Sequence, residues 1–266
     1  MSSENLERRI LDRVAAVARA LGQGHRLALL VLLAQGERSV EALSQAANLS
    51  LANASQHLQH LRRAGLVTTR REGKQVFYRL SDDAVVSLLV ALRTVAEANS
   101  PEVALLVAQH FRKLDDLEPL TRAELLRRIK QGAATLIDVR PPEEFAQGHL
   151  PGAINIPLSR LGRELDRLPV AREVVAYCRG PYCLMSYQAV VHLRRRGFQA
   201  RRLEDGFPEW RAAGLPVEAG KQTGEEPARP AAPVIHRRAH ETSVSGRRRS
   251  SASRPATPPP YGPDQP

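Results

Sequence analysis

The pattern of apolar residues changes once along this chain of 266 residues, near residue 118. Before that point, apolar residues recur at helical spacing, as in Leu6, Ile10 and Val14. After it, short β-prone runs alternate with helical stretches. Such alternation is typical of a mostly parallel sheet covered by helices on both faces. The length suits two domains of roughly 100 residues each, so we predict one domain in each part.

The first part predicts helices, then a hairpin, then a helix. Ser39 is a suitable N-cap for a third helix and Ser50 for a fourth, with Gly65 at the C′ position of the fourth. The β-prone runs 66–71 and 75–80 flank a short turn that contains glycine. Two short helices joined by a tight turn and followed by a hairpin predict a mainly-α winged helix-turn-helix domain.

The second part contains four β-prone runs separated by helical stretches. The runs cover residues 136–139, 153–156, 174–177 and 200–203, and the helical stretches cover 121–131, 158–168, 184–196 and 207–213. We therefore predict an α/β domain with a parallel sheet. The predicted boundaries are 1–100 for the first domain, 101–117 for a helical connector, 118–218 for the second domain and 219–266 for a tail.

The tail and the charge distribution indicate the partners of the chain. Residues 219–266 hold nine of the 19 prolines and the run Arg247-Arg248-Arg249, a composition that predicts a disordered basic tail. The net charge of +11 divides into +4 over 1–100, +3 over 101–218 and +4 over 219–266. A basic chain of this kind favours nucleic acid as a partner.

Other classes of protein fit the sequence poorly. Apolar stretches such as Leu27–Ala34 are too short to span a membrane, and residues 1–5 do not resemble a secretory signal. We therefore expect a cytoplasmic protein without a membrane partner. The two cysteines, Cys178 and Cys183, make no disulfide framework and are too few for a structural zinc site. We expect neither a metal nor a cofactor.

The fourth predicted helix carries the candidate DNA-reading residues. Ala54, Leu58 and Leu61 have the spacing of a buried face, and the residues beside them are polar, as base recognition requires. Arginines and a lysine at the end of this helix and in the hairpin are suited to phosphate contacts. The candidate DNA-binding residues are Asn53, Ser55, Gln56, His57, Arg62, Arg63, Arg70, Arg71 and Lys74.

Residues 43–67, followed by Arg71-Glu72-Gly73-Lys74, closely resemble the ArsR/SmtB family of winged-helix repressors. The resemblance covers about the first hundred residues and implies a homodimer, joined through its first and last helices, on a pseudo-palindromic operator of double-stranded DNA. Many relatives sense metals through Cys or His ligands. Residues 1–100 contain no cysteine, which disfavours metal sensing.

Cys178 follows an apolar strand directly and precedes a predicted helix. A loop in that position aims backbone N–H groups and the positive end of a helix at the thiol, which lowers its pKa and makes it nucleophilic. Arg179 adds a neighbouring positive charge. The residues therefore predict an activated thiolate at Cys178.

The residues around Cys178 resemble the rhodanese (sulfurtransferase) family over about a hundred positions. The motifs that carry this resemblance are Asp138-Val139-Arg140, Gly148 to Pro157, the Cys178 loop and Gly206-Phe207-Pro208-Glu209-Trp210. The resemblance implies that Cys178 accepts sulfane sulfur from thiosulfate, a persulfide or a polysulfide. The loop that would wrap the sulfur consists of Cys178, Arg179, Gly180, Pro181, Tyr182 and Cys183. We expect Asp138 and Arg140 to form a structural pair near this site.

The sequence leaves two interpretations of Cys183 open. Either it is a small side chain packed in the first turn of a helix, or both sulfurs face the same loop and Cys183 resolves a Cys178 persulfide. A tyrosine phosphatase is disfavoured because Leu184 stands where its arginine is needed, and a thioredoxin motif has fewer residues between its cysteines.

Together these features predict a DNA-binding repressor whose operator affinity responds, through the 101–117 connector, to sulfur loaded on Cys178. Two alternatives are a rhodanese-type sulfurtransferase with an autoregulatory DNA-binding domain, and a repressor with a vestigial sulfur domain. The main interpretation requires Cys178 and the 50–64 helix to be accessible.

Overall fold

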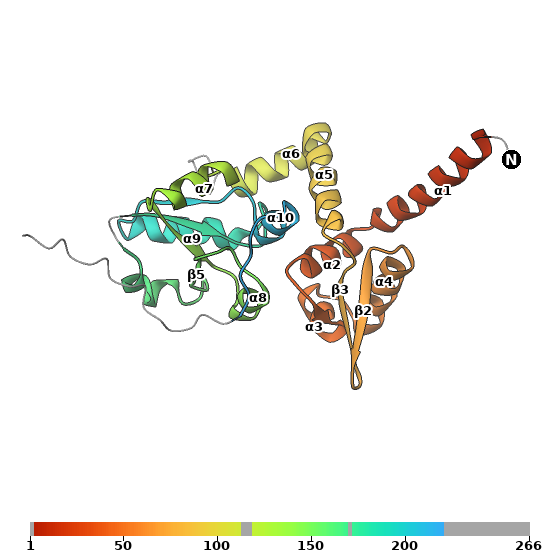
Figure 1. Cartoon of the computed structure of the whole chain (residues 1–266), viewed down its shortest axis with the longest axis horizontal. Coiled ribbons are helices and arrows are strands. Elements are labelled where there is room, and N and C mark those ends of the chain that lie inside the picture. The colour runs from red at the N-terminus through yellow and green to blue at the C-terminus, as the bar shows by residue number, and fades with distance from the viewer. Residues whose placement is uncertain (1–2, 113–118, 170–171, 221–266) are drawn as a thin grey trace, which may run out of the picture. The chain divides into compact units, whose positions relative to one another are not determined.

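The computed structural model describes residues 3–112, 119–169 and 172–220 (Figure 1). Most of the predicted tail and residues 113–117 of the predicted connector lie outside the described residues. Within the described residues no single helix is long and apolar enough to cross a membrane. One bent pair, Glu4–Leu21 and Gly24–Leu33, reaches that length and composition when taken together.

The N-terminal half is a winged helix. Its helices are α1 (Ser3–Leu21), α2 (Gly24–Ala34), α3 (Val40–Ala46), α4 (Leu51–Arg63) and α5 (Ala84–Asn99), and its strands are β1 (Arg38–Ser39), β2 (Val67–Glu72) and β3 (Gln75–Leu80). The three strands form an antiparallel sheet in the order β1-β3-β2. The β2–β3 hairpin extends beyond the helices around it (Figure 1). The predicted winged helix-turn-helix is confirmed.

Local sequence signals explain where its helices begin and end. The hydroxyl of Ser39 accepts from the backbone N–H of Ala42, and that of Ser50 accepts from Asn53, each at 3.3 Å. Gly65 follows α4 with a φ of 76°, a conformation that favours glycine. Both predicted N-caps and the predicted C′ glycine are therefore confirmed.

Two helical segments follow the winged helix. Helix α6 (Pro101–Val107) begins after Ser100, whose hydroxyl accepts from Val103, and continues as the π-helical turn η1 (Ala108–Arg112). The described part of the predicted connector is thus helical.

The C-terminal half is built on a parallel sheet. Its strands are β4 (Ala134–Asp138), β5 (Ile154–Asn155), β6 (Glu173–Tyr177) and β7 (Ala200–Arg202), in the order β5-β4-β6-β7. Its helices are α7 (Arg122–Lys130), α8 (Pro142–Gln147), α9 (Leu184–Arg195) and α10 (Phe207–Ala212). The predicted fold class, a winged helix followed by an α/β domain with a parallel sheet, is confirmed.

The alternation of side chains along β6 divides the core of this half in two. Val174 and Ala176 pack in a cluster that includes residues of α9, whereas Val175 and Tyr177 pack in a cluster that includes residues of α7, α8 and α10. Both faces of the sheet are therefore covered, as the apolar runs predicted.

Two local expectations were wrong or incomplete. The predicted helix at 158–168 is replaced by the 3₁₀ turns η2 (Leu161–Arg163) and η3 (Leu165–Arg167). Pro157, Gly162 and Pro169 disfavour a continuous helix there, and neither turn has a side-chain N-cap bond. Helix α8 and the two-residue strand β1 were not predicted from the sequence.

Candidate functional site

Cys178 follows β6 directly and begins the loop that leads to α9. Its Sγ is bonded to the Sγ of Cys183, the N-cap residue of α9. Gly180 reverses the loop with a φ of 149°, and its carbonyl accepts from the backbone N–H of Cys183 at 3.0 Å. This turn brings the two Cα atoms to 6.3 Å, within the usual range for a protein disulfide.

The structure corrects the expectation of an accessible, free thiolate at Cys178. The residue is 1% exposed and packs in the same cluster as Ala176 and residues of α9, because it continues the alternation of β6 onto that face of the sheet. Cys183 is partly exposed. Of the two interpretations of Cys183, the structure favours the one in which both sulfurs meet. Solvent reaches this pair from the Cys183 side.

The guanidinium of Arg179 does not act as an isolated charge beside the thiol. It donates to both carboxylate oxygens of Glu144 in α8, with the shortest contact at 2.5 Å. Arg38 of β1 donates to the same carboxylate at 2.6 Å. Burial alone would raise the pKa of Glu144, but the two arginines outweigh it and lower the pKa below its ordinary value. Glu144 therefore stays ionised between them.

Asp138 and Arg140 lie fully buried beneath the loop. The guanidinium of Arg140 donates to both oxygens of Asp138, with the shortest contact at 2.6 Å, and to the carbonyl of Gly148 at 2.7 Å. Burial alone would lower the pKa of Arg140, but the charge of Asp138 outweighs it and raises the pKa. This geometry supports the structural pair that we expected.

The start of α10 packs directly against the Cys178 loop. The backbone N–H of Phe207 donates to the carbonyl of Cys178 at 3.1 Å. A Cβ atom at Gly206 would lie 2.2 Å from the nitrogen of Gly180, so this close approach requires glycine. Sequence reasoning placed the motif 206–210 in the domain but did not assign it to this support.

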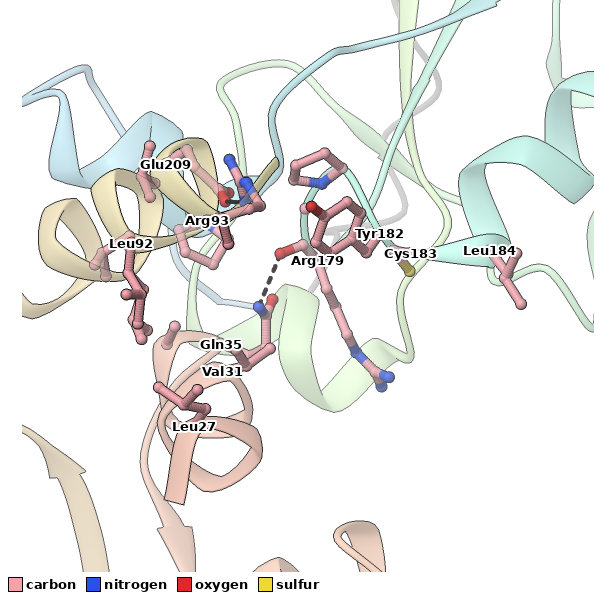
Figure 2. Close-up of a pocket in the computed structure, with 18 of the residues that line it drawn as sticks. Leu27, Val31, Gln35, Leu92, Arg93, Arg179, Tyr182, Cys183, Leu184 and Glu209 are labelled. Atoms are coloured by element: carbon pink, nitrogen blue, oxygen red, sulfur yellow. Dashed lines mark hydrogen bonds and ion pairs between the residues drawn. The ribbon is translucent and has the colours of Figure 1, made fainter. Parts of the chain in front are cut away.

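The winged helix holds the Cys178 loop directly. Gln35, the C-cap residue of α2, is 1% exposed. Its side-chain amide donates to the carbonyl of Arg179 at 3.2 Å (Figure 2) and accepts from Arg140 at 3.4 Å. The hydroxyl of Tyr182 donates to Glu97 of α5. Sequence reasoning missed Gln35 and Glu97, since no local pattern marks a contact between residues so far apart in the chain.

A cavity of about 610 Å³ adjoins the same loop. It lies among α2, α5, the segment 179–185 and the start of α10, as Figure 2 shows. Most of its lining is apolar, and Cys183 is part of that lining. Pockets of this size are suited to small molecules.

Helix α4 presents two different faces. Ala54, Leu58 and Leu61 are completely buried, which confirms the predicted packing face. Gln56, Arg62 and Arg63 are exposed, and Asn53, Ser55 and His57 are partly exposed. The helix thus offers its polar side to solvent, as base reading requires.

Two of the candidate DNA-binding residues contact other side chains of the winged helix. The ring of His57 lies 5.5 Å from that of His25, and burial followed by the charge of His25 lowers the pKa of His57. Arg70, Arg71 and Lys74 are all exposed, and Arg70 donates to Glu37 and to Glu72, each at 2.7 Å. A phosphate contact by Arg70 would compete with these carboxylates.

Comparison with known proteins identifies both halves. Residues 21–70 match the model of a helix-turn-helix domain, and residues 121–213 match that of a rhodanese-like domain. The chain is 47% identical over 215 residues to the HTH-type transcriptional regulator Rv0324 of Mycobacterium tuberculosis, an alignment that covers 81% of this chain and 94% of that protein.

The chain belongs to the HTH-type transcriptional regulators that join an ArsR-type winged helix to a rhodanese-like domain. Each half also has relatives of its own. A sulfurtransferase of Allochromatium vinosum is 36% identical over 85 residues, which cover 32% of this chain and 78% of that protein. A biofilm growth-associated repressor of Agrobacterium fabrum is 42% identical over 90 residues, which cover 34% of this chain and 76% of that protein.

Proposed function

We propose that this regulator is a homodimeric, cytoplasmic repressor whose affinity for operator DNA depends on the sulfur chemistry of Cys178 and Cys183. The observation that carries the proposal is the direct contact between the Cys178 loop and the winged helix. Gln35 binds the carbonyl of Arg179, and Arg38 shares the Glu144 carboxylate with the guanidinium of Arg179. A change in the loop therefore acts on residues that lie just before the helix-turn-helix.

DNA binding rests on the solvent side of α4 and on the hairpin. Asn53 and Gln56 are suited to adenine, and Ser55 can donate or accept. Arg62, Arg63, Arg71 and Lys74 supply positive charge for phosphates. Binding should therefore weaken steeply as the salt concentration rises.

The dimer rests on two exposed apolar helix faces. In α1, Leu6, Ile10 and Val14 are between 51% and 59% exposed, and α1 extends away from the other helices of its half (Figure 1). In α5, Leu88 and Val95 are also exposed. Faces of this kind are stable in water when a partner covers them. A second copy is the partner that the ArsR resemblance implies.

The sulfur chemistry proceeds in two balanced steps. The disulfide form buries Cys178, so the first step belongs to the dithiol form, in which Cys183 no longer holds the loop closed. There the Cys178 thiolate attacks the outer sulfur of a persulfide donor, forms Cys178–S–SH and releases the donor thiolate. The Cys183 thiolate then attacks the inner sulfur, forms the Cys178–Cys183 disulfide and expels hydrosulfide. The disulfide in the structure corresponds to the product. A reducing cytoplasm holds the pair as thiols until sulfane sulfur arrives.

Coupling to DNA follows from the geometry of the loop. Opening the disulfide frees the turn at Gly180 and with it the positions of the Arg179 carbonyl and guanidinium. These groups bind Gln35 and share Glu144 with Arg38. A coupling free energy of about 1–3 kcal/mol changes operator affinity by about 5- to 150-fold.

A gel-shift titration on the upstream region of the gene tests the proposal. Wild type and Cys178→Ala are compared with and without polysulfide at fixed salt, with Gln188→Ala, a change at an exposed residue of α9, as the control. The wild type should change its affinity, and Cys178→Ala should not. Equal affinities for both proteins under both conditions would falsify the proposal.

Two further measurements, thiosulfate turnover and alkylation of Cys178, separate the alternatives. Thiosulfate turnover comparable to that of dedicated enzymes, without any effect on DNA binding, would assign the chain to sulfur transfer with autoregulation. If Cys178 resisted alkylation after reduction of the disulfide, the protein would be a repressor with a vestigial sulfur domain. The burial of Cys178 in a disulfide favours neither rapid turnover nor decay of the site.

A further inference from the structure

The cavity beside the Cys178 loop has an apolar lining drawn from five parts of the chain. Most of its apolar residues come from α2, from α5 and from the loop with the first turn of α9, and α6 and α10 add Val103 and Pro208. The apolar residues include Leu27, Val31, Leu89, Val90, Leu184 and Met185. Its volume of about 610 Å³ falls within the range of small-molecule sites.

The charged side chains that line the cavity are all paired. Arg93 contacts Glu209 at 3.2 Å (Figure 2), and Arg179 contacts Glu144 at 2.5 Å. A charged ligand would have to compete with these pairs and lose its hydration in an apolar site. An apolar molecule would meet neither cost.

One of the two disulfide-bonded cysteines lines this cavity. Cys183 lines the cavity, whereas Cys178 is 1% exposed and packs in the core of the sheet. A nucleophile inside the cavity therefore encounters Cys183. The Cys178 thiolate is the group that leaves, next to the N-cap residue of α9, where the positive end of the helix stabilises negative charge.

We infer that the cavity admits an apolar low-molecular-weight thiol that reduces the disulfide by attacking Cys183. The incoming thiolate forms a mixed disulfide with the Sγ of Cys183, and the electron pair of the broken bond goes to Cys178 as a thiolate. A second molecule of the thiol then attacks the mixed disulfide, releases the oxidised thiol and leaves Cys183 reduced. This inference rests on the proposed redox role of the pair and names the class of thiol that resets it.

Reduction rates of the full-length disulfide protein test the inference. The probes are benzyl mercaptan, which is apolar, and 2-mercaptoethanesulfonate, which is anionic, each compared at an equal concentration of thiolate. The apolar thiol should react faster by about tenfold or more, the ratio that roughly 1.4 kcal/mol of favourable binding gives. Alkylation during the reaction, followed by peptide mapping, should find the mixed disulfide on Cys183 and the alkylated thiol on Cys178.

A matched pair of variants locates the selectivity. Val31 lines the cavity and is 48% exposed, while Ile129 of α7 is 38% exposed and is not among the lining residues. Val31→Gln should reduce the preference for benzyl mercaptan several-fold, and Ile129→Gln should leave it unchanged. Because both positions are exposed on helices, both variants should fold.

Four results would overturn the inference. Equal rates for the two thiols, or an adduct on Cys178, would mean that the cavity does not select the attacking molecule. A preference that emerges only after removal of residues 221–266, or only on dilution of a dimer, would assign the cavity to the tail or to a second copy. None of these results bears on whether the disulfide and dithiol forms differ in DNA affinity, which the gel shift measures separately.

Discussion

Helix α4 and the Cys178 loop differ in how their surroundings fix them. The packing face of α4 is set by residues three to four positions apart, Ala54, Leu58 and Leu61, and its other face meets solvent. The Cys178 loop is held by residues distant in sequence, with Gln35 and Arg38 on one side and Glu144 on the other. The solvent face of α4 is thus set by local spacing, whereas the position of the Cys178 loop depends on residues of the winged helix and of α8.

The largest expected effect concerns the buried pair beneath the loop. Arg140→Ala leaves the Asp138 carboxylate buried without its partner, so the free energy of unfolding should fall by about 3–5 kcal/mol. Urea unfolding of the full chain measures this change. The control is Arg70→Ala, which removes an exposed pair and should cost under about 1 kcal/mol. Similar losses for the two variants would contradict the structural role of Arg140.

The next effect concerns base reading by α4. Asn53→Ala combined with Gln56→Ala should abolish specific operator binding, because each base contact contributes about 1–3 kcal/mol of discrimination. The Cys178–Cys183 disulfide should form and open as in the wild type. Gln188→Ala removes an exposed amide from α9 and serves as the control. If sequence preference survived the double change, our placement of the recognition helix would be wrong.

A smaller effect concerns the link between the two regions. Arg38→Gln removes one of the two arginines on Glu144. The coupling free energy, which is RT times the logarithm of the ratio of operator affinities of the disulfide and dithiol forms, should therefore fall by about 0.5–2 kcal/mol. Competition gel shifts on both forms measure that ratio. Arg79→Gln, an exposed arginine of β3, should leave the ratio intact. An unchanged ratio in Arg38→Gln would remove this ion pair from the coupling route.

The smallest effect concerns the stability of the folded protein at acid pH. The two arginines lower the pKa of Glu144 below its ordinary 4.5, so its ionised form stabilises the folded state above that pH. This stability is lost as the pH falls through the lowered pKa. Urea midpoints between neutral and acid pH should therefore fall less steeply for Glu144→Gln than for the wild type. Parallel curves would show that Glu144 makes no such contribution.

The sequence predicted those parts of the molecule that local signals determine. Features that depend on neighbours within a few residues could be predicted. They are the helix caps at Ser39 and Ser50, the turn at Gly65 and the alternation of side chains along β6. The helix expected at 158–168 was wrong because apolar spacing suggested it while prolines and a glycine prevented it.

The site was harder to predict because its contacts span the chain. The position of the loop could be predicted from the sequence. The burial of Cys178, however, depends on α9 covering the sheet, and its bond to Cys183 depends on the turn at Gly180. Gln35 and Glu144 looked like ordinary polar residues. The partners of Gln35 lie more than a hundred positions away and those of Glu144 lie 35 and 106 positions away, and at such separations pattern and spacing carry no information.

The affinity of the full-length protein for its operator, measured by fluorescence anisotropy on the purified disulfide form and on the same sample after reduction, tests the central claim most directly. At one fixed salt concentration, we predict dissociation constants that differ by about 5- to 150-fold, and equal constants for the two preparations of Cys183→Ala. Identical dissociation constants for the disulfide and dithiol forms of the wild type would contradict the account.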